Sequence, residues 1–464
     1  LKFSSRQFFA SRPCVCPMLA PCRSRAARLG MSIQTWHPCL ASRSPSSAQP
    51  FLSVCRSLSV GAGADIPEGG SLYYPKNSRA YVLGPNDPRP LAGLSVAIIG
   101  ASGNIGRSIA MSLTAQRQKL AGLGPFTIKF CGRRQGSSFT TLIGLCSELR
   151  DTYDEFCPHL EVYPDLEAVQ ADIIVMVAGA TLSHTYKNHA ALARANLDLF
   201  EEHANVMVKK NPKSMVVVGT NPVEVGVDAF VAAGFHPDRV IGTGALCDTL
   251  RFRREVASEV GVPRQYVTGL VLGMHGLAMV QCWSTVRLAA VCSAEAEEKL
   301  ERLKEEGLGR MPVDVEETRK LAIKVRDMTE ANDAFHANQI VRAQPPEIRA
   351  ALRRYVSNFA GPSYPRFFIG QVVADTVIDL LNGRELFTAA QVYLTTDFLG
   401  LKDHAIGAPV VLSGKGIRLN PVPLTRVEEQ AIRESGKQIQ EMAAAVRAIK
   451  SLREATRMKR RGSF

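Results

Sequence analysis

The chain has a glycine-rich turn directly after a short apolar run, in the segment SVAIIGASGNIGRSIAMSL at residues 95–113. The apolar run predicts a buried strand, and the apolar side chains after the glycines recur at helical spacing. Strand, glycine turn and helix in this order are the setting in which such a motif binds a dinucleotide. Gly100 permits the tight turn, Gly103 the close approach of a pyrophosphate, and Gly106 the close packing of helix on strand. The helix N-terminus offers its free amide groups to the phosphates.

Buried strands and helices alternate over residues 93–222, and this predicts an α/β fold, a Rossmann doubly wound parallel sheet. Beyond Pro222 the pattern is mixed, and we expect a second, α+β catalytic and substrate domain over residues 223–464. The predicted strands are at 95–99, 126–131, 159–163, 172–178, 214–219, 266–273, 279–288, 391–396 and 408–413. The predicted helices are at 104–118, 139–150, 187–210, 246–260, 294–308, 314–330, 344–358, 368–382 and 425–456.

The first 64 residues differ in composition from the rest of the chain. They contain Lys2 and seven arginines but no aspartate or glutamate, and they are rich in serine, alanine and proline. This composition is typical of an organelle transit segment, whereas a disordered basic tail with another role is the alternative. We expect residues 1–64 to be disordered and to direct the protein to the mitochondrial matrix, or alternatively to a plastid. Residues 65–92 are rich in proline, glycine and asparagine, and this composition predicts an extended arm.

The charge and cysteine content exclude several other classes of protein. Of the net charge of +13, +8 lies in residues 1–64, and the remaining +5 gives no sign of nucleic-acid binding. No apolar run approaches the roughly 18 residues that cross a membrane. Beyond the leader the six remaining cysteines are scattered without a CxxC pair, so we expect neither a disulfide framework nor a metal site.

Several segments, taken in order, resemble the malate/lactate dehydrogenase family. They are GASGNIG at 100–106, ELRD at 148–151, VAGA at 177–180, GTNPVEV at 219–225, RVIGTGALCDTLRFR at 239–253 and VLGMHGLAM at 271–279. The resemblance extends from about residue 94 to about residue 456. It implies hydride transfer between a nicotinamide cofactor and malate or another small 2-hydroxy acid. It also implies a homodimer or homotetramer.

The resemblance assigns the chemistry to four residues. Oxidation of a secondary alcohol needs a base for the hydroxyl proton, and His275 is the candidate because imidazole titrates near neutral pH. Asp248 is its candidate partner and would fix the tautomer of the ring. Arg251, three residues later on the same helical face, would hold the substrate C1 carboxylate with its planar fork. Asn221 would contact the substrate oxygen and the nicotinamide, and the Asn221–Pro222 bond is a candidate for a cis peptide.

The choice between NADP and NAD depends on the end of the second strand. An NAD site has an acidic residue there for the ribose diol. This chain has instead Arg133, Arg134 and Ser137, which suit a 2′-phosphate, although a solvent-exposed basic turn is the alternative. NADP is therefore favoured over NAD. The other predicted cofactor contacts are Gly100, Gly103, Asn104, Ile105, Gly106, Ala178, Gly179 and Asn221.

The segment after VAGA departs from the pattern of malate dehydrogenases, which have two arginines there for the substrate. An ungapped alignment places Leu182 and Asn188 at these two substrate positions. Lys187 can supply a point charge if the loop is shifted by one residue. The chain beyond His275 is also longer than in the family, and we expect an insertion near 293–345. These departures leave open a second reading, in which the chain is a dehydrogenase-derived binding or structural subunit of an organellar complex.

Overall fold

The computed structural model describes residues 81–82, 94–123, 126–154, 157–181, 189–361 and 366–461. The chain divides into two units, Leu1–Leu72 and Tyr73–Phe464. The first unit lies outside the described residues. The predicted targeting segment at 1–64 lies outside them too. Within the predicted arm at 65–92, Tyr81–Val82 forms β1, which pairs antiparallel with β4 (His159–Tyr163).

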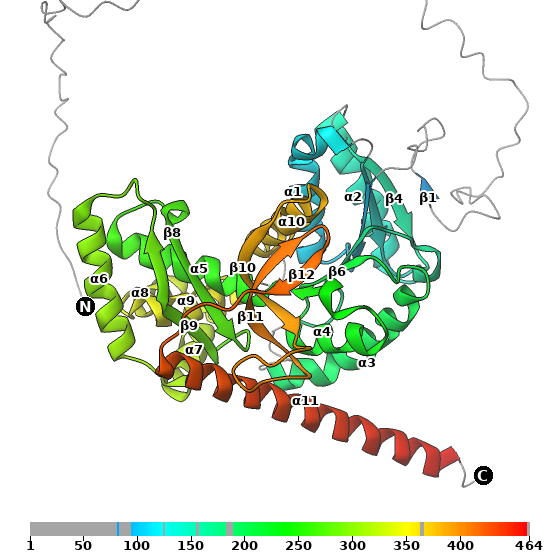
Figure 1. The fold of residues 1–464 in the computed structure, drawn as a ribbon. Helices are drawn as coiled ribbons and strands as arrows, with labels where there is room; N and C mark the ends of the chain where they lie inside the picture. The colour runs from blue at the N-terminus through cyan, green and yellow to red at the C-terminus, as the bar shows by residue number, and fades with distance from the viewer. Residues whose placement is uncertain are drawn as a thin grey trace, which may run out of the picture. The chain divides into compact units, whose positions relative to one another are not determined.

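Six parallel strands form the sheet that carries the glycine turn (Figure 1). In spatial order they are β4, β3 (Phe126–Cys131), β2 (Leu94–Ile99), β5 (Ile173–Met176), β6 (Met215–Val218) and β7 (Val240–Gly242). Counted along the chain, this is the 3-2-1-4-5-6 order of a dinucleotide-binding sheet. The predicted doubly wound parallel sheet is thus confirmed, and its parallel strands continue past the predicted boundary at residue 222 to Gly242.

Both faces of this parallel sheet are covered by helices. Along β2, Val96 and Ile98 belong to the core on one face, and Ala97 and Ile99 to the core on the other. The first core includes side chains of α1 (Asn104–Ala115), α2 (Ser137–Tyr153) and α10 (Phe367–Leu381), and the second includes those of α3 (His189–Val208) and α4 (Val223–Ala232). A strand buried on both faces is apolar throughout, and this is why the run before the glycines does not alternate.

The sheet continues into an antiparallel half through short contacts. Strand β7 pairs with β10 (Leu386–Tyr393) at Gly242 and Gln391, and β11 (Ala405–Ser413) pairs with β8 (Val267–Gly273) at Gly407 and Gly273. The remaining strands, β9 (Met279–Leu288) and β12 (Gly416–Leu419), pair with β8 and β11. The predicted mixed half therefore shares one twelve-stranded sheet with the parallel half.

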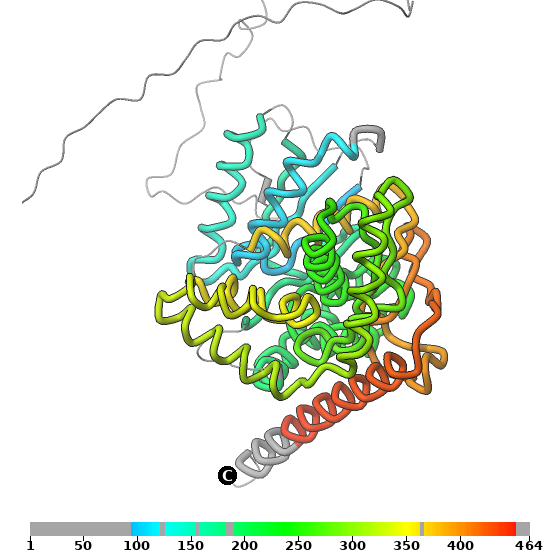
Figure 2. The backbone as a smooth tube through the Cα atoms, turned by 90° about the vertical axis from the view of Figure 1, so that its left-hand side faces the viewer, coloured from blue at the N-terminus to red at the C-terminus, as the bar shows by residue number. Residues whose placement is uncertain are grey.

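The remaining helices pack around the antiparallel half (Figure 2). They are α5 (Gly244–Val260), α6 (Ala294–Gly309), α7 (Val315–Glu330), α8 (Ala334–Arg342), α9 (Pro346–Phe359) and α11 (Arg426–Arg461). Helices α6 to α8 fill the predicted insertion near 293–345, and α9 packs on α5 and α7. Helix α11 contacts β8 and β9 with one part and α3 with another, so it joins the two halves. None of the helices in the described ranges is both long and apolar enough to span a bilayer.

The sequence pattern does not predict strands β7 and β12 or helices α4 and α8. Strands β7 and β12 have three and four residues, too few to show a period of two. Helix α4 is buried almost all round, so its apolar residues give no helical stripe. Helix α8 has nine residues. Short or uniformly buried elements carry no periodic signal, and their positions follow from the packing of their neighbours.

Candidate functional site

The glycine turn lies at the carboxyl end of β2 and leads into α1. Gly100 has φ +93°, and a Cβ there would lie 2.5 Å from the backbone nitrogen of Ala178. A Cβ at Gly106 would lie 2.4 Å from the carbonyl oxygen of Gly100. The N-cap residue of α1, Gly103, has no side chain to cap the first-turn amides, so these remain suited to phosphate oxygens. The structure brings together these predicted cofactor positions: Gly100, Gly103, Asn104, Ile105, Gly106, Ala178 and Gly179.

The predicted 2′-phosphate position lies at the end of β3. Arg133 and Ser137 are exposed there, between β3 and the start of α2. Nη2 of Arg134 lies 3.3 Å from Oδ2 of Asp165, and both side chains are more than half exposed. A carboxylate is thus present beside Arg134, and it comes from the segment after β4 and not from the end of β3. It offsets part of the positive charge that the sequence places at this position.

The predicted contact between Asp248 and His275 is present. Oδ2 of Asp248 lies 2.7 Å from Nδ1 of His275, and Oδ1 accepts a hydrogen bond of 3.2 Å from Nη1 of Arg251. Burial by itself raises the pKa of the Asp248 carboxyl, but the facing His275, together with Arg354 and Arg251, outweighs it and holds the pKa at about 2. The carboxylate therefore stays ionised near neutral pH and faces Nδ1 of the imidazole.

His275 lies in the turn between β8 and β9, and three groups hold this turn. Its backbone nitrogen donates to Oε1 of the buried Glu224, at 2.7 Å. Oγ of Ser435, on α11, accepts from the nitrogen of Met274 at 2.7 Å and donates to the carbonyl of Ala278 at 2.8 Å. The imidazole packs against the first residue of α5, since a Cβ at Gly244 would lie 2.6 Å from Cγ of His275.

Asn221 follows β6 at the same edge of the sheet. The Asn221–Pro222 peptide is cis, as the sequence suggested. The carbonyl of Asn221 accepts a 2.7 Å hydrogen bond from Nδ2 of the buried Asn196, whose side chain also binds both backbone groups of Ala180. Asn196 thereby ties the loop after β5 to the loop after β6. Oδ1 of Asn221 is buried and has no hydrogen-bond partner among the described residues, so the amide is available to a ligand.

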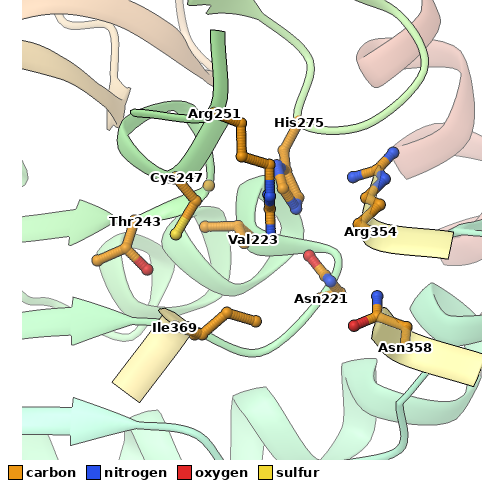
Figure 3. A pocket seen from close by; sticks show the side chains of 11 residues that line it. Asn221, Val223, Thr243, Cys247, Arg251, His275, Arg354, Asn358 and Ile369 are labelled. Carbon is orange, nitrogen blue, oxygen red and sulfur yellow. The ribbon is translucent and has the colours of Figure 1, made fainter. Parts of the chain in front are cut away.

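Asn221, Arg251 and His275 line one pocket, together with Arg354 (Figure 3). In Figure 3 the imidazole of His275 lies between Arg251 on one side and Arg354 on the other, with Asn221 below. The remaining lining residues are Gly219, Val223, Thr243, Gly244, Cys247, Asn358 and Ile369. Predicted residues from β6, α5 and the β8–β9 turn thus meet in space, as the resemblance implies. The predicted substrate positions Leu182 and Asn188 lie outside the described residues.

Sequence reasoning missed Arg354 and Asn358, which reach the pocket from α9. Arg354 is 4% exposed and stands three and four residues after the buried Ala351 and Ala350. It therefore occupies the buried stripe of an amphipathic helix, where a charged residue is out of place. That local conflict is visible in the sequence, but only the packing of α9 shows which site the arginine reaches.

The chain is similar to lactate and malate dehydrogenases in sequence and in fold. Residues 94–242 match the family model for the lactate/malate dehydrogenase NAD-binding domain. An L-lactate dehydrogenase of Lacticaseibacillus casei is 26% identical over 60% of this chain and 74% of its own length. A malate dehydrogenase of Staphylococcus carnosus is 28% identical over 61% of this chain and 75% of its own length. The fold is similar to that of lactate dehydrogenase from Cryptosporidium parvum, solved with lactic acid and nicotinamide adenine dinucleotide (TM-score 0.59, 19% identity, 77% of this chain and 98% of that one).

Proposed function

Because this chain belongs to the malate/lactate dehydrogenase family, we propose that it is an NAD(P)-dependent dehydrogenase of malate or another small 2-hydroxy acid. The observation that carries the proposal is the contact of Asp248 with His275, with Arg251 on the same carboxylate. A structural subunit has no need of a buried, ionised carboxylate aligned on a histidine in a pocket. The alternative of a binding or structural subunit gains no support from any contact in the described part of the chain.

Each side chain of the pocket has a role in this reaction. Arg251 binds the C1 carboxylate with its guanidinium, which lies over the ring of Phe368, 4.7 Å from its centroid. His275 accepts the hydroxyl proton during oxidation and returns it to the oxygen during reduction. Asp248 keeps the imidazole in the required tautomer and stabilises its protonated form. Asn221 orients the oxygen that becomes the carbonyl. A nicotinamide cofactor, held by the glycine turn after β2 and by Asn221, would supply the acceptor for the hydride of the hydroxy acid.

The turn after β2 fits a dinucleotide because its glycines leave the backbone accessible. A Cβ at Gly103 would meet one atom within 4 Å, the carbonyl oxygen of Gly100 at 3.4 Å, so the outer side of the turn is open. Ser102 on the turn and Ser138 on α2 share a 2.9 Å hydrogen bond, which holds the turn beside the end of β3. NAD is the cofactor that the family model names. Arg133 and Arg134 support NADP as well, with Asp165 opposing it.

Two further properties complete the proposal. The acid-free, arginine- and serine-rich composition of residues 1–64 supports import into an organelle, which we propose is the mitochondrion, with a plastid as the alternative. We also propose a homodimer or homotetramer, from the family resemblance. N-terminal sequencing of the protein from its source and light scattering of the purified protein test these two properties.

A spectrophotometric assay tests the reaction itself. The full chain is incubated with NADH or NADPH and a panel of 2-oxo acids, and the loss of absorbance of the reduced nicotinamide is followed. We expect turnover with at least one acid, and none with His275→Asn, a variant that keeps the size of the side chain but removes the base. Absence of turnover by the wild type with every acid, although the nucleotide binds, would contradict the proposed function.

A further inference from the structure

Arg354 is a buried cation that faces the proposed active site, and its guanidinium lies 5.4 Å from the ring centroid of Tyr355. It is 4% exposed, and its Nε and Nη2 atoms have no hydrogen-bond partner among the described residues. Arg354 acts electrostatically on the carboxylate of Asp248, but both oxygens of that carboxylate are already engaged, by His275 and Arg251. A buried guanidinium with two nitrogens that lack hydrogen-bond partners is unfavourable, and this points to an anion that arrives from outside.

The neighbouring arginines of α9 contrast with Arg354. Nε of Arg349 donates to Oε2 of Glu255 at 2.9 Å, and Arg353 forms a second ion pair with the same carboxylate. Glu255 lies on α5, four residues after Arg251 and seven after Asp248, so one face of α5 carries all three. The same helical face that positions His275 therefore also holds α9, and it fixes Arg354 relative to the catalytic histidine.

The geometry of the pocket defines what Arg354 can bind. Arg251, His275 and Arg354 line the same pocket, and in the view of Figure 3 the two arginines flank the imidazole. A second cavity of about 450 Å³ adjoins the pocket and shares with it Arg251, Arg354, Asn358 and Ile369. An acid held by Arg251 at C1, with its hydroxyl at His275, would extend its far end toward Arg354. The adjoining cavity leaves room for that end.

We propose that Arg354 is a specificity-determining residue that binds a second carboxylate of the substrate. The site would thereby select 2-hydroxy and 2-oxo dicarboxylic acids over monocarboxylic acids of the same length. This inference rests on the proposed dehydrogenase function and adds to it a residue and a substrate class. A guanidinium matches a carboxylate with two parallel hydrogen bonds, and two unpartnered nitrogens are present for this purpose.

Two substrates of equal length test the inference. Oxaloacetate and 2-oxobutyrate both have four carbons, and the first has a carboxylate where the second has a methyl group. For Arg354→Met we expect kcat/KM with oxaloacetate to fall about 10- to 100-fold, the value of one or two charge-assisted contacts. With 2-oxobutyrate, kcat/KM should change less than about threefold, and Arg354→Lys should lie between. Arg342→Met, at an exposed position on α8, is the control and should change neither.

Equal losses with both substrates would overturn the inference, because Arg354 would then act on the shared reacting group or on the fold. A stability measurement separates these two causes. Replacing a buried guanidinium that has two unpartnered nitrogens with an apolar side chain of similar length should leave the melting temperature of the ligand-free protein unchanged or raise it. A melting temperature several degrees lower would mean that Arg354 has a structural role, and this too would contradict the inference.

A binding experiment keeps the inference independent of turnover. Calorimetric titrations with hydroxymalonate, a dicarboxylate, and oxamate, which has one carboxylate, are performed with and without NADH. We expect hydroxymalonate to bind more tightly, and Arg354→Met to remove that difference. If the wild type reduces no 2-oxo acid but shows this Arg354-dependent binding, the proposed function fails and the inference stands. If hydroxymalonate binds no more tightly than oxamate, the inference fails.

Discussion

Oδ2 of Asp248 lies 2.7 Å from Nδ1 of His275, although 27 positions separate the two residues in the chain. This distance makes the two side chains one unit. Asp248→Asn keeps the shape but loses the charge that stabilises a protonated imidazole, so we expect kcat to fall about 10²- to 10⁴-fold. The measurement is steady-state kinetics, with thermal unfolding of each variant as a control. Activity of Asp248→Asn within threefold of the wild type would exclude the proposed role of the carboxylate.

Gly244 leaves the space that the His275 ring occupies. A Cβ at this position would lie 2.6 Å from Cγ of His275, so Gly244→Ala should displace the ring from its contact with Asp248. We expect kcat to fall about 10- to 100-fold, the effect of a displacement on the order of 1 Å.

Gly144→Ala provides the matched control for this substitution. Gly144 is a helical glycine of α2, and a Cβ there has no atom within 4 Å. The substitution should leave kcat unchanged and raise stability by about 0.5–1 kcal/mol. If Gly244→Ala retained full activity, the ring would not depend on this packing.

Cofactor choice should respond to the charges at the end of β3. Asp165→Asn releases Arg134 from its 3.3 Å ion pair, so we expect NADPH to bind more tightly in this variant and NADH to be unaffected. Replacing Arg133 and Arg134 together by alanine should weaken NADPH at least ~100-fold relative to NADH. Calorimetric titration of each variant with both nucleotides measures these shifts. An unchanged ratio of the two affinities in the double variant would identify the arginines as a solvated turn.

The stability of the protein should depend on pH through Asp228. This α4 residue is buried, and desolvation raises the pKa of its carboxyl from 3.8 to about 7, although its Oδ1 accepts a 2.8 Å hydrogen bond from the nitrogen of Ala405. The folded protein therefore holds a proton that the unfolded chain releases between about pH 4 and pH 7. The contribution of Asp228 to the free energy of unfolding is fully present below about pH 4. It is lost as the pH rises to about 7.

Asp228→Asn removes this dependence. At pH 8 we expect the variant to be more stable than the wild type, by up to the order of 4 kcal/mol, and the difference should disappear toward pH 4. Urea unfolding at pH 5, 6, 7 and 8 measures it. If the variant were less stable than the wild type at pH 8, the ion pair of Asp228 with Arg447, at 4.0 Å, would outweigh the cost of burying the carboxylate.

Features that depend on local patterns could be predicted from the sequence alone. The strand before the glycines, the turn at Gly100 and the start of α1 follow from short-range periodicity and from the conformations that glycine permits. The placement of Asp248 and Arg251 on one helical face follows from the three-residue spacing. Each of these signals depends on residues a few positions apart. Over that range the backbone geometry fixes which side chains lie on the same face.

The tertiary structure decided the features that depend on distant segments. Glu224 reaches the turn of His275 from 51 positions away, and Glu255 pairs with Arg349 across 94 positions. Arg354 enters the pocket because α9 packs on α5, and no periodic pattern encodes which helix an apolar stripe will meet. Contacts of this range follow from strand order and from the fit of packed side chains, and for this reason the second cation of the pocket became visible only in the folded chain.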